Sequence, residues 1–558
     1  MLPDPDPTTA GRPLLAWLDD PAADRGIHFA RADGTWSFHA YARLAELARR
    51  AAGALACEGV RRDDVVTLMG RSGPEFVAAF FGTLLAGATP SPVAPPLTFG
   101  DPDAYRDHLA GVLRTARPAL VVADAELADE VAGLAGGAWR TLDAASLLAG
   151  DAAADPPGRG VAELALLQLT SGSSGPARAV RVPYAALEAN VGAIRHWLRW
   201  TRDDAFASWL PLHHDMGLVG GLLSSVVAGS DLWLLQPEHF VREPLRWLRG
   251  LGASGARLTV TPAFGLDHAA RRVPAEALEG LDFSGVRGVV VGAERIDART
   301  LDAFQALLAP AGLRREALLP AYGLAEATLA VSGVPVDEGW TGVAVEPASL
   351  ALGRAVEPAA DGGATVVGCG RPLAGVDVRI EDEDRSPLPE GHVGEVVVRG
   401  ASLAAGYGGE AASLTTLADG VLRTGDAGFL LDGQLFVLGR LGDSVKVRGR
   451  VVFSEDLEVA LGEAGASRPR VAVLLGVHAG VPTAVLLAEE AEPAWRGAAE
   501  ALLRRRTGGA RVVFVGAARG TIARTSSGKP RRRRLWQAFV EGSLAGEAGA
   551  AHTGSENG

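Results

Sequence analysis

A run of small polar residues near the first third of the chain could bind a phosphate group. The run lies within LALLQLTSGSSGPARAVRV, residues 164–182, and consists of Thr170, Ser171, Gly172, Ser173, Ser174 and Gly175. Such residues let consecutive backbone N–H groups turn toward one anion, and their hydroxyl groups add donors without bulk. Serine-glycine runs are more often flexible linkers. Here β-like segments flank the run, so the sequence predicts a hairpin with a phosphate-binding loop.

Two other groups of polar residues follow apolar segments. His213, His214 and Asp215 come after the strand-like residues 206–211, and Glu326 comes shortly after the apolar residues 317–319. Ligands of open α/β sheets bind at the carboxyl ends of the strands, so we expect these groups to lie close together. The apolar helix expected over 218–228 contains small residues, which fit either a ligand tail or close helix packing.

Composition and charge exclude several classes of protein. With 558 residues, 48% hydrophobic and 22% charged, the chain is expected to be a folded soluble protein with several globular units. A net charge of -12 argues against binding to nucleic acid. The two cysteines are too few for a disulfide framework or a zinc cluster and favour a reducing cytoplasm. The acidic start MLPDPDPTTA does not resemble a signal peptide, and no apolar stretch reaches the roughly 20 residues of a membrane span.

The elements that must position these polar residues alternate between strand and helix. Apolar residues at helical spacing predict helices over 41–58, 74–86 and 184–200. Short apolar runs predict buried strands over 64–69, 120–123, 258–261, 286–291 and 317–319. This alternation predicts an α/β fold with layers of parallel sheet.

The pattern changes in the last third of the chain. Short alternating strands at 376–380 and 394–399 predict a small β-barrel-like subdomain, and Asp432-Gly433 predicts a tight hairpin turn. Strands at 445–447, 471–475, 484–488 and 511–515 predict a separate α+β unit. We therefore expect a large N-terminal domain over 1–440, a small mobile C-terminal domain over 441–545 and a disordered tail over 546–558.

Nine short blocks occur in order along nearly the whole chain: TSGSSG, SWLPLHHDMGL, VGAE, AYGLAEATL, CGRP, VGEVVVRG, LRTGD, GRLGDSVKVRGR and TSSGK. Their order and spacing resemble the adenylate-forming superfamily of acyl-CoA synthetases, nonribosomal adenylation domains and luciferases. HDMGLVGGL, VGCGRP and LRTGDAGFLLDGQLFVLGR most resemble the fatty acyl-AMP ligase branch. The segment at about 331–368 matches the position of the insertion that distinguishes this branch.

The resemblance implies that the protein joins a carboxylic acid to AMP. The carboxylate attacks the α-phosphate of ATP in line and pyrophosphate leaves, so positive groups and Mg²⁺ must neutralise crowded oxyanions. It implies that residues 170–175 bind the β- and γ-phosphates, that Glu326 binds Mg²⁺, and that Lys529 stabilises the developing charge. Without the resemblance, Glu326 would be a charge near a helix start. Lys529 would otherwise begin a basic face, the run Arg531–Arg534, which we expect to be solvated. We assign these four arginines no catalytic role, although they could meet an acidic carrier protein.

The resemblance also implies the nucleoside contacts. Tyr322 is expected to stack on adenine, and Asp426 to accept hydrogen bonds from both ribose hydroxyls with the help of Arg440. Asp426 would otherwise be an ordinary turn aspartate. The remaining residues expected around the nucleotide are Gly292, Ala293, Glu294, Ala321 and Gly323.

On the acyl side, the resemblance places His214 at the mouth of the pocket as a gating and catalytic residue. Asp215 stays ambiguous, because amino-acid-activating relatives use an aspartate there to pair with the substrate amine. Asp443 is expected to be the hinge between the two domains. The other expected acyl-pocket residues are Met216, Val219, Gly220, Leu222 and Phe264.

Several positions depart from the family pattern. Arg178-Ala179 stands where the phosphate loop usually continues to Lys-Gly, and Ser174 stands for the usual threonine. Gly442 replaces a basic residue of the hinge block, and His213 and Ala263 replace a common aromatic residue and a common asparagine beside the acyl pocket. The last two changes put a plain long-chain fatty acid in doubt.

We therefore expect an ATP- and Mg²⁺-dependent enzyme that activates a carboxylic, fatty acid and transfers it to an acyl carrier protein or carrier domain of a polyketide or nonribosomal peptide system. Two other enzymatic interpretations stay open, an acyl-CoA ligase and an amino-acid adenylating enzyme. A third alternative is an inactive binding or scaffold protein, which the changes at Arg178 and Gly442 would permit. The presence of Glu326, Asp426 and Lys529 argues against it.

Overall fold

The computed structural model describes residues 14–95, 102–133, 139–149, 162–170, 178–346, 349–359, 364–408, 414–447, 450–463, 470–490, 493–524 and 529–544. Ser171, Gly172, Ser173, Ser174 and Gly175 of the predicted phosphate loop lie outside these ranges, as does the predicted tail over 546–558.

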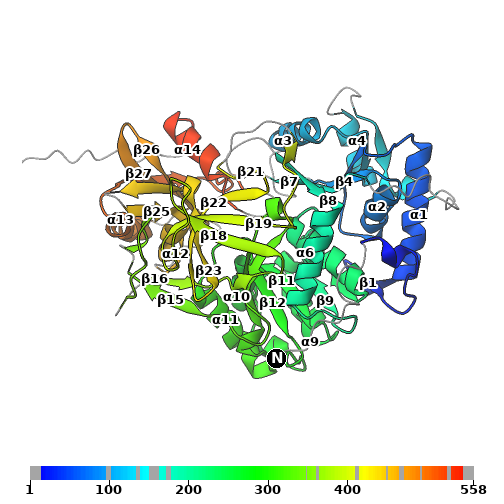
Figure 1. Ribbon diagram of the computed structural model, residues 1–558, viewed down its shortest axis with the longest axis horizontal. Helices are drawn as coiled ribbons and strands as arrows, with labels where there is room; N and C mark the ends of the chain where they lie inside the picture. Colours follow the sequence, from blue (N-terminus) through cyan, green and yellow to red (C-terminus); the bar gives the residue numbers. More distant parts are fainter. Residues whose placement is uncertain are drawn as a thin grey trace, which may run out of the picture.

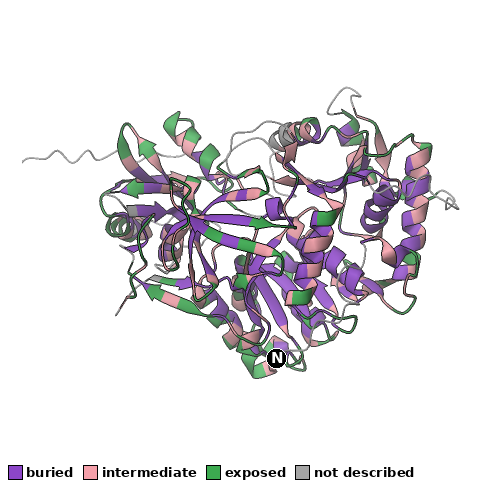
Figure 2. Ribbon diagram, viewed as in Figure 1, coloured by how far each residue is buried: buried purple, intermediate pink, exposed green. Residues whose placement is uncertain are grey.

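The largest sheet has nine strands in the order β17-β14-β13-β12-β11-β9-β10-β1-β2. Neighbours from β13 to β1 are parallel, and the strands at both edges are antiparallel. The central strands are buried, as expected for a parallel sheet covered on both faces (Figure 2). The predicted parallel α/β layer is confirmed. The strands are β1 (Gly26–Ala30), β2 (Trp36–Ala40), β9 (Phe206–Ser208), β10 (Leu232–Leu234), β11 (Leu258–Pro262), β12 (Gly288–Gly292), β13 (Leu318–Gly323), β14 (Ala330–Gly333) and β17 (Arg371–Pro372).

A second parallel sheet of four strands, in the order β4-β3-β5-β6, forms the N-terminal part. Its helices α1 and α2 pack closely, because a Cβ on Gly82 would lie 2.5 Å from the Cβ of Ala51. The strands are β3 (Val65–Met69), β4 (Thr89–Pro92), β5 (Leu120–Ala123) and β6 (Thr141–Asp143). The helices are α1 (Tyr41–Cys57), α2 (Pro74–Leu85), α3 (Pro102–Ala116), α4 (Ala125–Gly133) and α5 (Ala144–Ala149).

The helix expected over 218–228 differs in kind from the prediction. Residues Met216–Leu223 form a π-helix, η2, and α7 (Ser224–Ala228) continues it. At its start, a Cβ on Gly217 would lie 2.3 Å from the carbonyl oxygen of Pro211, so only glycine permits this close approach. The other helices around the main sheet are α6 (Tyr184–Trp197), α8 (Pro237–Arg242), α9 (Leu245–Gly252), α10 (Ala263–Arg272) and α11 (Ala298–Leu308).

The predicted hairpin around the phosphate loop is confirmed. β7 (Leu164–Thr170) and β8 (Arg178–Pro183) are antiparallel and place Thr170 opposite Arg178. A third strand, β20 (Tyr407–Gly408), pairs with β8 although it lies more than 220 residues further along the chain. This pairing brings Tyr407 beside Arg178, the first residue of β8.

The predicted barrel-like subdomain is an open five-stranded sheet, and no barrel closes among the described residues. Its order is β18-β19-β22-β21, with β23 paired to β22. Asp432 and Gly433 both have positive φ, 51° and 70°, as a tight hairpin turn requires. A separate hairpin, β15 (Gly342–Val345) with β16 (Ala364–Val367), lies within the predicted insertion. The sheet strands are β18 (Val376–Glu381), β19 (Gly394–Gly400), β21 (Thr416–Ala418), β22 (Val421–Leu431) and β23 (Gln434–Arg440).

The C-terminal elements gather at the end of the molecule opposite α1 and α2 (Figure 1). The sheet β26-β27-β28 packs α12 and α13 on one face and α14 on the other, each with its own apolar core. No helix in the described part of the chain is long and apolar enough to cross a membrane. The elements are β24 (Ser444–Val447), β25 (Arg450–Phe453), α12 (Ser454–Glu463), β26 (Val471–His478), β27 (Val481–Glu489), α13 (Pro493–Thr507), β28 (Arg511–Ala517) and α14 (Arg532–Val540).

Candidate active site

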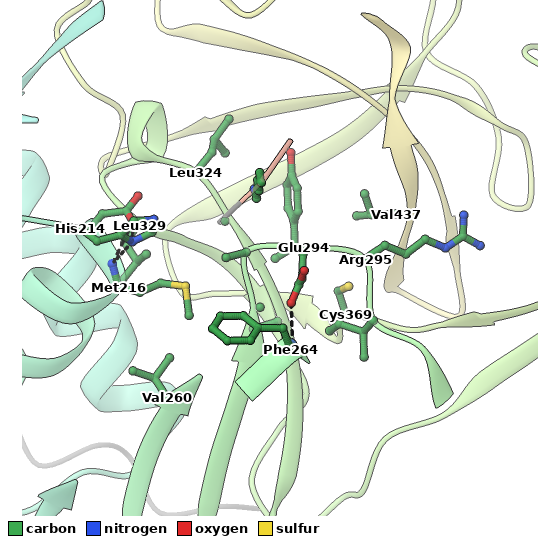
Figure 3. Close-up of a pocket in the computed structure, with 18 of the residues that line it drawn as sticks. His214, Met216, Val260, Phe264, Glu294, Arg295, Leu324, Leu329, Cys369 and Val437 are labelled. Carbon is green, nitrogen blue, oxygen red and sulfur yellow. Dashed lines mark hydrogen bonds and ion pairs between the residues drawn. The ribbon is translucent and has the colours of Figure 1, made fainter. Parts of the chain in front are cut away.

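A cavity of about 790 Å³ lies where the main sheet, the β22–β23 hairpin and the C-terminal elements meet. Figure 3 shows Met216, Val260 and Phe264 around one part of it, and Cys369 and Val437 around another. It brings together residues separated by more than 350 positions in the sequence. The predicted site residues that line it are Thr170, His214, Asp215, Met216, Gly220, Phe264, Gly292, Ala293, Glu294, Ala321, Tyr322, Gly323, Glu326, Asp426, Arg440, Asp443 and Lys529.

Two predicted acyl-pocket residues do not line this cavity. Val219 and Leu222 are completely buried in the main apolar core. Gly220, between them in the sequence, does line the cavity, and a Cβ there would lie 3.1 Å from Leu329 Cδ2. Neighbouring residues of a helical turn point in different directions, so only one face of η2 can border the cavity.

Three side chains, Arg178, Tyr407 and Glu326, form a cluster at the edge of the cavity where β8 begins. The guanidinium carbon of Arg178 lies 3.3 Å from the ring centroid of Tyr407, and its Nη1 lies 3.9 Å from Glu326 Oε1. The Tyr407 hydroxyl donates to the same Oε1 at 2.8 Å. Burial and the Glu326 carboxylate raise the pKa of Tyr407, so its hydroxyl stays protonated as a donor.

Glu326 itself lies in the turn η6 (Ala325–Ala327) after β13, and it is buried. Among the described residues, Oε2 of Glu326 accepts no hydrogen bond, whereas Oε1 accepts from Tyr407. The described residues contain no group of three or more His, Cys, Asp or Glu that could hold a metal ion. A cation here would therefore need oxygen ligands from a substrate as well as Glu326.

Asp426 lies at the centre of a second cluster, on β22. Its Oδ2 accepts a hydrogen bond from the Tyr322 hydroxyl at 2.6 Å, and its Oδ1 lies 3.1 Å from Nε of Arg440, its cross-strand neighbour on β23. The Asp426 carboxylate raises the pKa of Arg440. Each carboxylate oxygen has two acceptor positions, so these contacts leave capacity for further donors.

The turn after β12 carries Glu294, whose side chain contacts helix α10. Glu294 Oε1 accepts a hydrogen bond of 2.7 Å from the backbone N–H of Phe264, in the first turn of α10 (Figure 3). Ala293, which precedes Glu294, has a φ of +67°, a left-handed conformation that residues with a Cβ adopt rarely. This tight turn directs Glu294 into the cavity while its carboxylate holds α10 in place.

His214 and Asp215 form a close pair at the start of η2. Nδ1 of His214 lies 2.7 Å from Oδ1 of Asp215, which also accepts from the Met216 backbone N–H at 2.8 Å. Burial alone would raise the pKa of Asp215, but His214, the Met216 N–H and Lys529 together lower it. Burial and the neighbouring His214 lower the pKa of His213 to about 3, so His213 is neutral near pH 7.

Lys529 projects into this cavity from the segment before α14. Burial and the Arg440 guanidinium lower the pKa of Lys529, while the carboxylates of Glu294, Asp426 and Asp215 oppose this shift. Lys529 thus interacts electrostatically with three carboxylates from separate parts of the chain, Glu294, Asp426 and Asp215.

The arginine run after Lys529 is not a uniformly solvated face, which corrects the sequence interpretation for one member. Arg533 and Arg534 are exposed, but Arg532 is buried. Its guanidinium lies 3.3 Å from Asp443, 3.0 Å from Glu455 and 2.8 Å from Glu458. Arg532 is buried because these three carboxylates neutralise it, two from α12 and one from the predicted hinge.

Sequence reasoning missed Tyr407 and Arg532 as residues of the site. Tyr407 stands alone between glycines in a loop-like segment, and nothing local distinguishes it from a surface tyrosine. Arg532 is hidden in a run of four arginines. Their partners lie 81 and 74 to 89 positions away, so no local pattern could identify them.

The AMP-binding enzyme family matches residues 18–408 of the chain. The long-chain-fatty-acid–AMP ligase FadD32 of Mycolicibacterium smegmatis is 31% identical over 549 residues, with 86% of both chains covered. The medium-chain-fatty-acid–[acyl-carrier-protein] ligase JamA of Moorena producens is 31% identical over 543 residues, with 90% of both covered. This chain belongs to the AMP-binding enzyme family, in its fatty acyl-AMP ligase branch.

A solved structure leads to the same conclusion for the fold of this AMP-binding enzyme. A structure from a study of fatty acyl-adenylate ligases of E. coli and L. pneumophila superposes with a TM-score of 0.88 at 30% identity. It covers 97% of this chain and all of the solved chain. The similarity therefore includes the C-terminal elements that carry Lys529.

Proposed function

We propose that this AMP-binding enzyme converts ATP and a fatty acid into acyl-AMP and pyrophosphate, and then transfers the acyl group to the thiol of a carrier protein. One observation carries the proposal. The cavity is lined by Thr170 beside the loop 171–175, by Glu326, by Asp426 and by Lys529, from four separate parts of the chain. Its acidic, basic and apolar parts suit a nucleoside triphosphate next to an apolar acid.

The nucleotide would bind along the carboxyl edge of the main sheet. Tyr322 would lie against adenine, between Gly292–Glu294 and the Ala321–Gly323 backbone. Asp426, held by Arg440 and Tyr322, would accept hydrogen bonds from the ribose hydroxyls. Residues 170–175 would bind the β- and γ-phosphates. Arg178, which keeps a positive charge where the family pattern has lysine, would add to the field at this edge.

The donor set at Glu326 fits Mg²⁺. Mg²⁺ is bound in nucleotide sites by one or two carboxylates together with substrate phosphates, and Glu326 offers one buried carboxylate with Oε2 available. Bound there, Mg²⁺ would neutralise phosphate charge. Tyr407 and Arg178 would hold the Glu326 side chain in position.

In the first reaction, an oxygen of the fatty carboxylate forms a bond to the α-phosphorus while the bond from that phosphorus to the leaving pyrophosphate breaks. Negative charge on the α-phosphate oxygens must be stabilised as this happens. Lys529, which lines the cavity, would provide a positive charge between the two anionic reactants and so stabilise the developing negative charge. His214, held by Asp215, would border the entrance to the acyl part of the cavity.

In the second reaction, the sulfur of a phosphopantetheine thiol attacks the acyl carbonyl, the bond to AMP breaks and the thiol proton is released. The similar protein JamA is an acyl-carrier-protein ligase, which supports transfer to a carrier protein, whereas FadD32 is a fatty-acid AMP ligase and supports the first reaction. Asp443 would serve as the hinge between residues 1–440 and 441–545. A cytoplasmic location agrees with the low cysteine content.

Measuring pyrophosphate release from ATP with a panel of acids, from short polar to long-chain, tests the first reaction. We expect release with apolar acids and little with amino acids. Supplying the thiol either as CoA or as a phosphopantetheinylated carrier protein then tests the second reaction, with the carrier as the expected acceptor. Preference for CoA or for an amino acid would favour the corresponding alternative ligase, and no release with any acid would favour an inactive homologue.

A further inference from the structure

The N-terminal half of helix α12 carries three carboxylates at the boundary between the main body and the C-terminal elements. Glu455, Asp456 and Glu458 lie within four residues of each other. Carboxylates are favourable at a helix N-terminus, but here they also face two arginines from other elements, Arg532 and Arg295. We refer to these three carboxylates as the α12 acidic turn.

On the C-terminal side, Arg532 joins the α12 acidic turn to the segment that carries Lys529. Its Nη1 lies 3.0 Å from Glu455, and its Nη2 lies 2.8 Å from Glu458. Nη1 also lies 3.3 Å from Asp443, at the predicted hinge. Arg532 is three residues from Lys529, so these contacts restrict where the Lys529 backbone can lie.

On the main-body side, Arg295 binds the same turn. Arg295 follows Glu294 at the end of β12, and its guanidinium contacts Asp456 of α12. It also donates a 2.9 Å hydrogen bond to the carbonyl oxygen of Leu438 on β23. Its side chain is only 12% exposed, and Arg295 is among the residues that line the cavity.

We infer that Arg295, the α12 acidic turn and Arg532 form a clamp that positions Lys529 for acyl-AMP formation. The chain of contacts runs from β12, where Glu294 faces the nucleotide part of the cavity, through α12 to Arg532 and so to Lys529. The inference rests on the proposed function, and it assigns Arg295 and Arg532 as positioning residues. Neither side chain is expected to contact the reacting atoms.

The clamp is specific for the first reaction. Lys529 acts in the first reaction. The Arg295–Asp456 contact joins the main body to the C-terminal elements, so a rotation of the C-terminal elements about Asp443 would break this contact. Acyl transfer from acyl-AMP already formed should therefore not need it. This separates a positioning role from a purely structural one, which would affect both reactions equally.

The first test measures the two reactions separately in Arg295→Gln, Asp456→Asn and Arg532→Gln. We expect kcat for pyrophosphate release to fall roughly tenfold or more, with smaller changes in the KM values of ATP and acid. Transfer from synthetic acyl-AMP to the carrier should stay within about twofold of the original enzyme. Asp456 is 32% exposed, so Asp456→Asn breaks the clamp with less risk to folding than Arg532→Gln. Arg505→Gln, at an exposed arginine of α13, is the matched control.

The second test needs no catalysis. Lys446 and Lys529 are the only lysines in the sequence, so an amine-reactive reagent labels only these two side chains and the N-terminus. Mass spectrometry of labelling against pH would give the pKa of Lys529, with Lys446, whose side chain is 59% exposed, as the internal reference. Loosening the clamp should move the pKa of Lys529 upward toward its ordinary value of 10.5, because Lys529 would leave the desolvating surroundings and the Arg440 guanidinium that lower it.

The inference is overturned if the clamp variants lose both reactions in parallel with their thermal stability, or if they leave pyrophosphate release and the Lys529 pKa unchanged. Failure of the proposed function would give a different experimental result from failure of the clamp. In that case the original enzyme itself would release no pyrophosphate, whereas the labelling experiment would still report whether the clamp positions Lys529.

Discussion

The residue proposed to supply positive charge near the reacting atoms is a lysine, in a chain that otherwise uses arginine almost exclusively. Of the 54 lysines and arginines in the sequence, only Lys446 and Lys529 are lysines. A compact ammonium group on a flexible stem can enter the space between two anionic reactants, whereas a planar guanidinium group is suited to flat, bidentate contacts. The surroundings of Lys529, with Glu294, Asp426 and Asp215 nearby, fit this role.

We predict that Lys529→Met lowers the rate of pyrophosphate release by about 100- to 1000-fold, or roughly 3–4 kcal/mol, as removal of one preorganised donor typically does. The matched control is Lys446→Met, since Lys446 is exposed and paired with Glu383 outside the cavity. Pyrophosphate release by the control should be unchanged. Retention of more than a tenth of the original rate by Lys529→Met would contradict the role of Lys529.

The pH dependence of acyl-AMP formation should also report Lys529. Its pKa is lowered from the ordinary 10.5, and the charged form, present below that pKa, is the form that stabilises negative charge. We therefore expect kcat for pyrophosphate release to decline with rising pH at a midpoint below 10.5. In Lys529→Arg, a slower enzyme, this alkaline decline should be absent because arginine stays charged. If the original enzyme and Lys529→Arg showed an alkaline decline with the same midpoint, the decline would belong to another group.

At the scale of elements, the π-helix η2 determines which of its residues border the cavity. π-helical turns are frequent at functional sites. Here the turn presents Gly220 to the cavity and buries Val219 and Leu222. A Cβ at Gly220 would lie only 3.1 Å from Leu329 Cδ2, so a larger side chain here would press against Leu329 and narrow the cavity.

We predict that Gly220→Val raises the KM for long-chain acids by about tenfold, since one or two methylene-sized groups in an apolar pocket change binding by roughly 1–3 kcal/mol. Short acids should be affected much less. Steady-state pyrophosphate release with acids of increasing length would measure this. Gly192→Ala on α6 is the control, because a Cβ there meets no atom within 4 Å. An equal effect on short and long acids would argue that Gly220 does not border the acyl chain.

At the scale of the whole molecule, charge is divided unevenly along the chain. The segment 470–544 contains 13 lysines and arginines against 5 aspartates and glutamates, although the entire chain has a net charge of -12. Part of this excess, Arg533 and Arg534, is exposed on α14, at the end of the molecule where the C-terminal elements gather (Figure 1). Such a surface attracts an acidic partner.

We predict that reversing these charges, with Arg533→Glu and Arg534→Glu together, slows acyl transfer to an acidic carrier protein by about tenfold at low ionic strength. The difference should shrink at high salt, because exposed charges are screened. Pyrophosphate release without a carrier is the internal control and should not change. Transfer kinetics that are unaffected at every salt concentration would exclude this surface as the carrier contact.

Much of the architecture was accessible from the sequence. Local patterns show which residues avoid water, and this is why the buried strands at 258–261 and 120–123, the helix over 41–58 and the Asp432-Gly433 turn were correctly predicted. The order of short blocks was enough to identify the family. Nearly all the predicted site residues with described positions line one cavity.

What the sequence by itself determined is therefore the set of elements, their parallel α/β arrangement and the family of adenylate-forming enzymes. Only the tertiary structure decided that Gly220 borders the cavity while Val219 and Leu222 do not, that the five-stranded sheet stays open, and that Arg532 is buried rather than solvated. The physical reason is the range of the interactions. Apolar periodicity and turn chemistry act over a few residues, whereas the direction of a helical turn and the neutralisation of a buried charge depend on groups that folding brings together from distant parts of the chain.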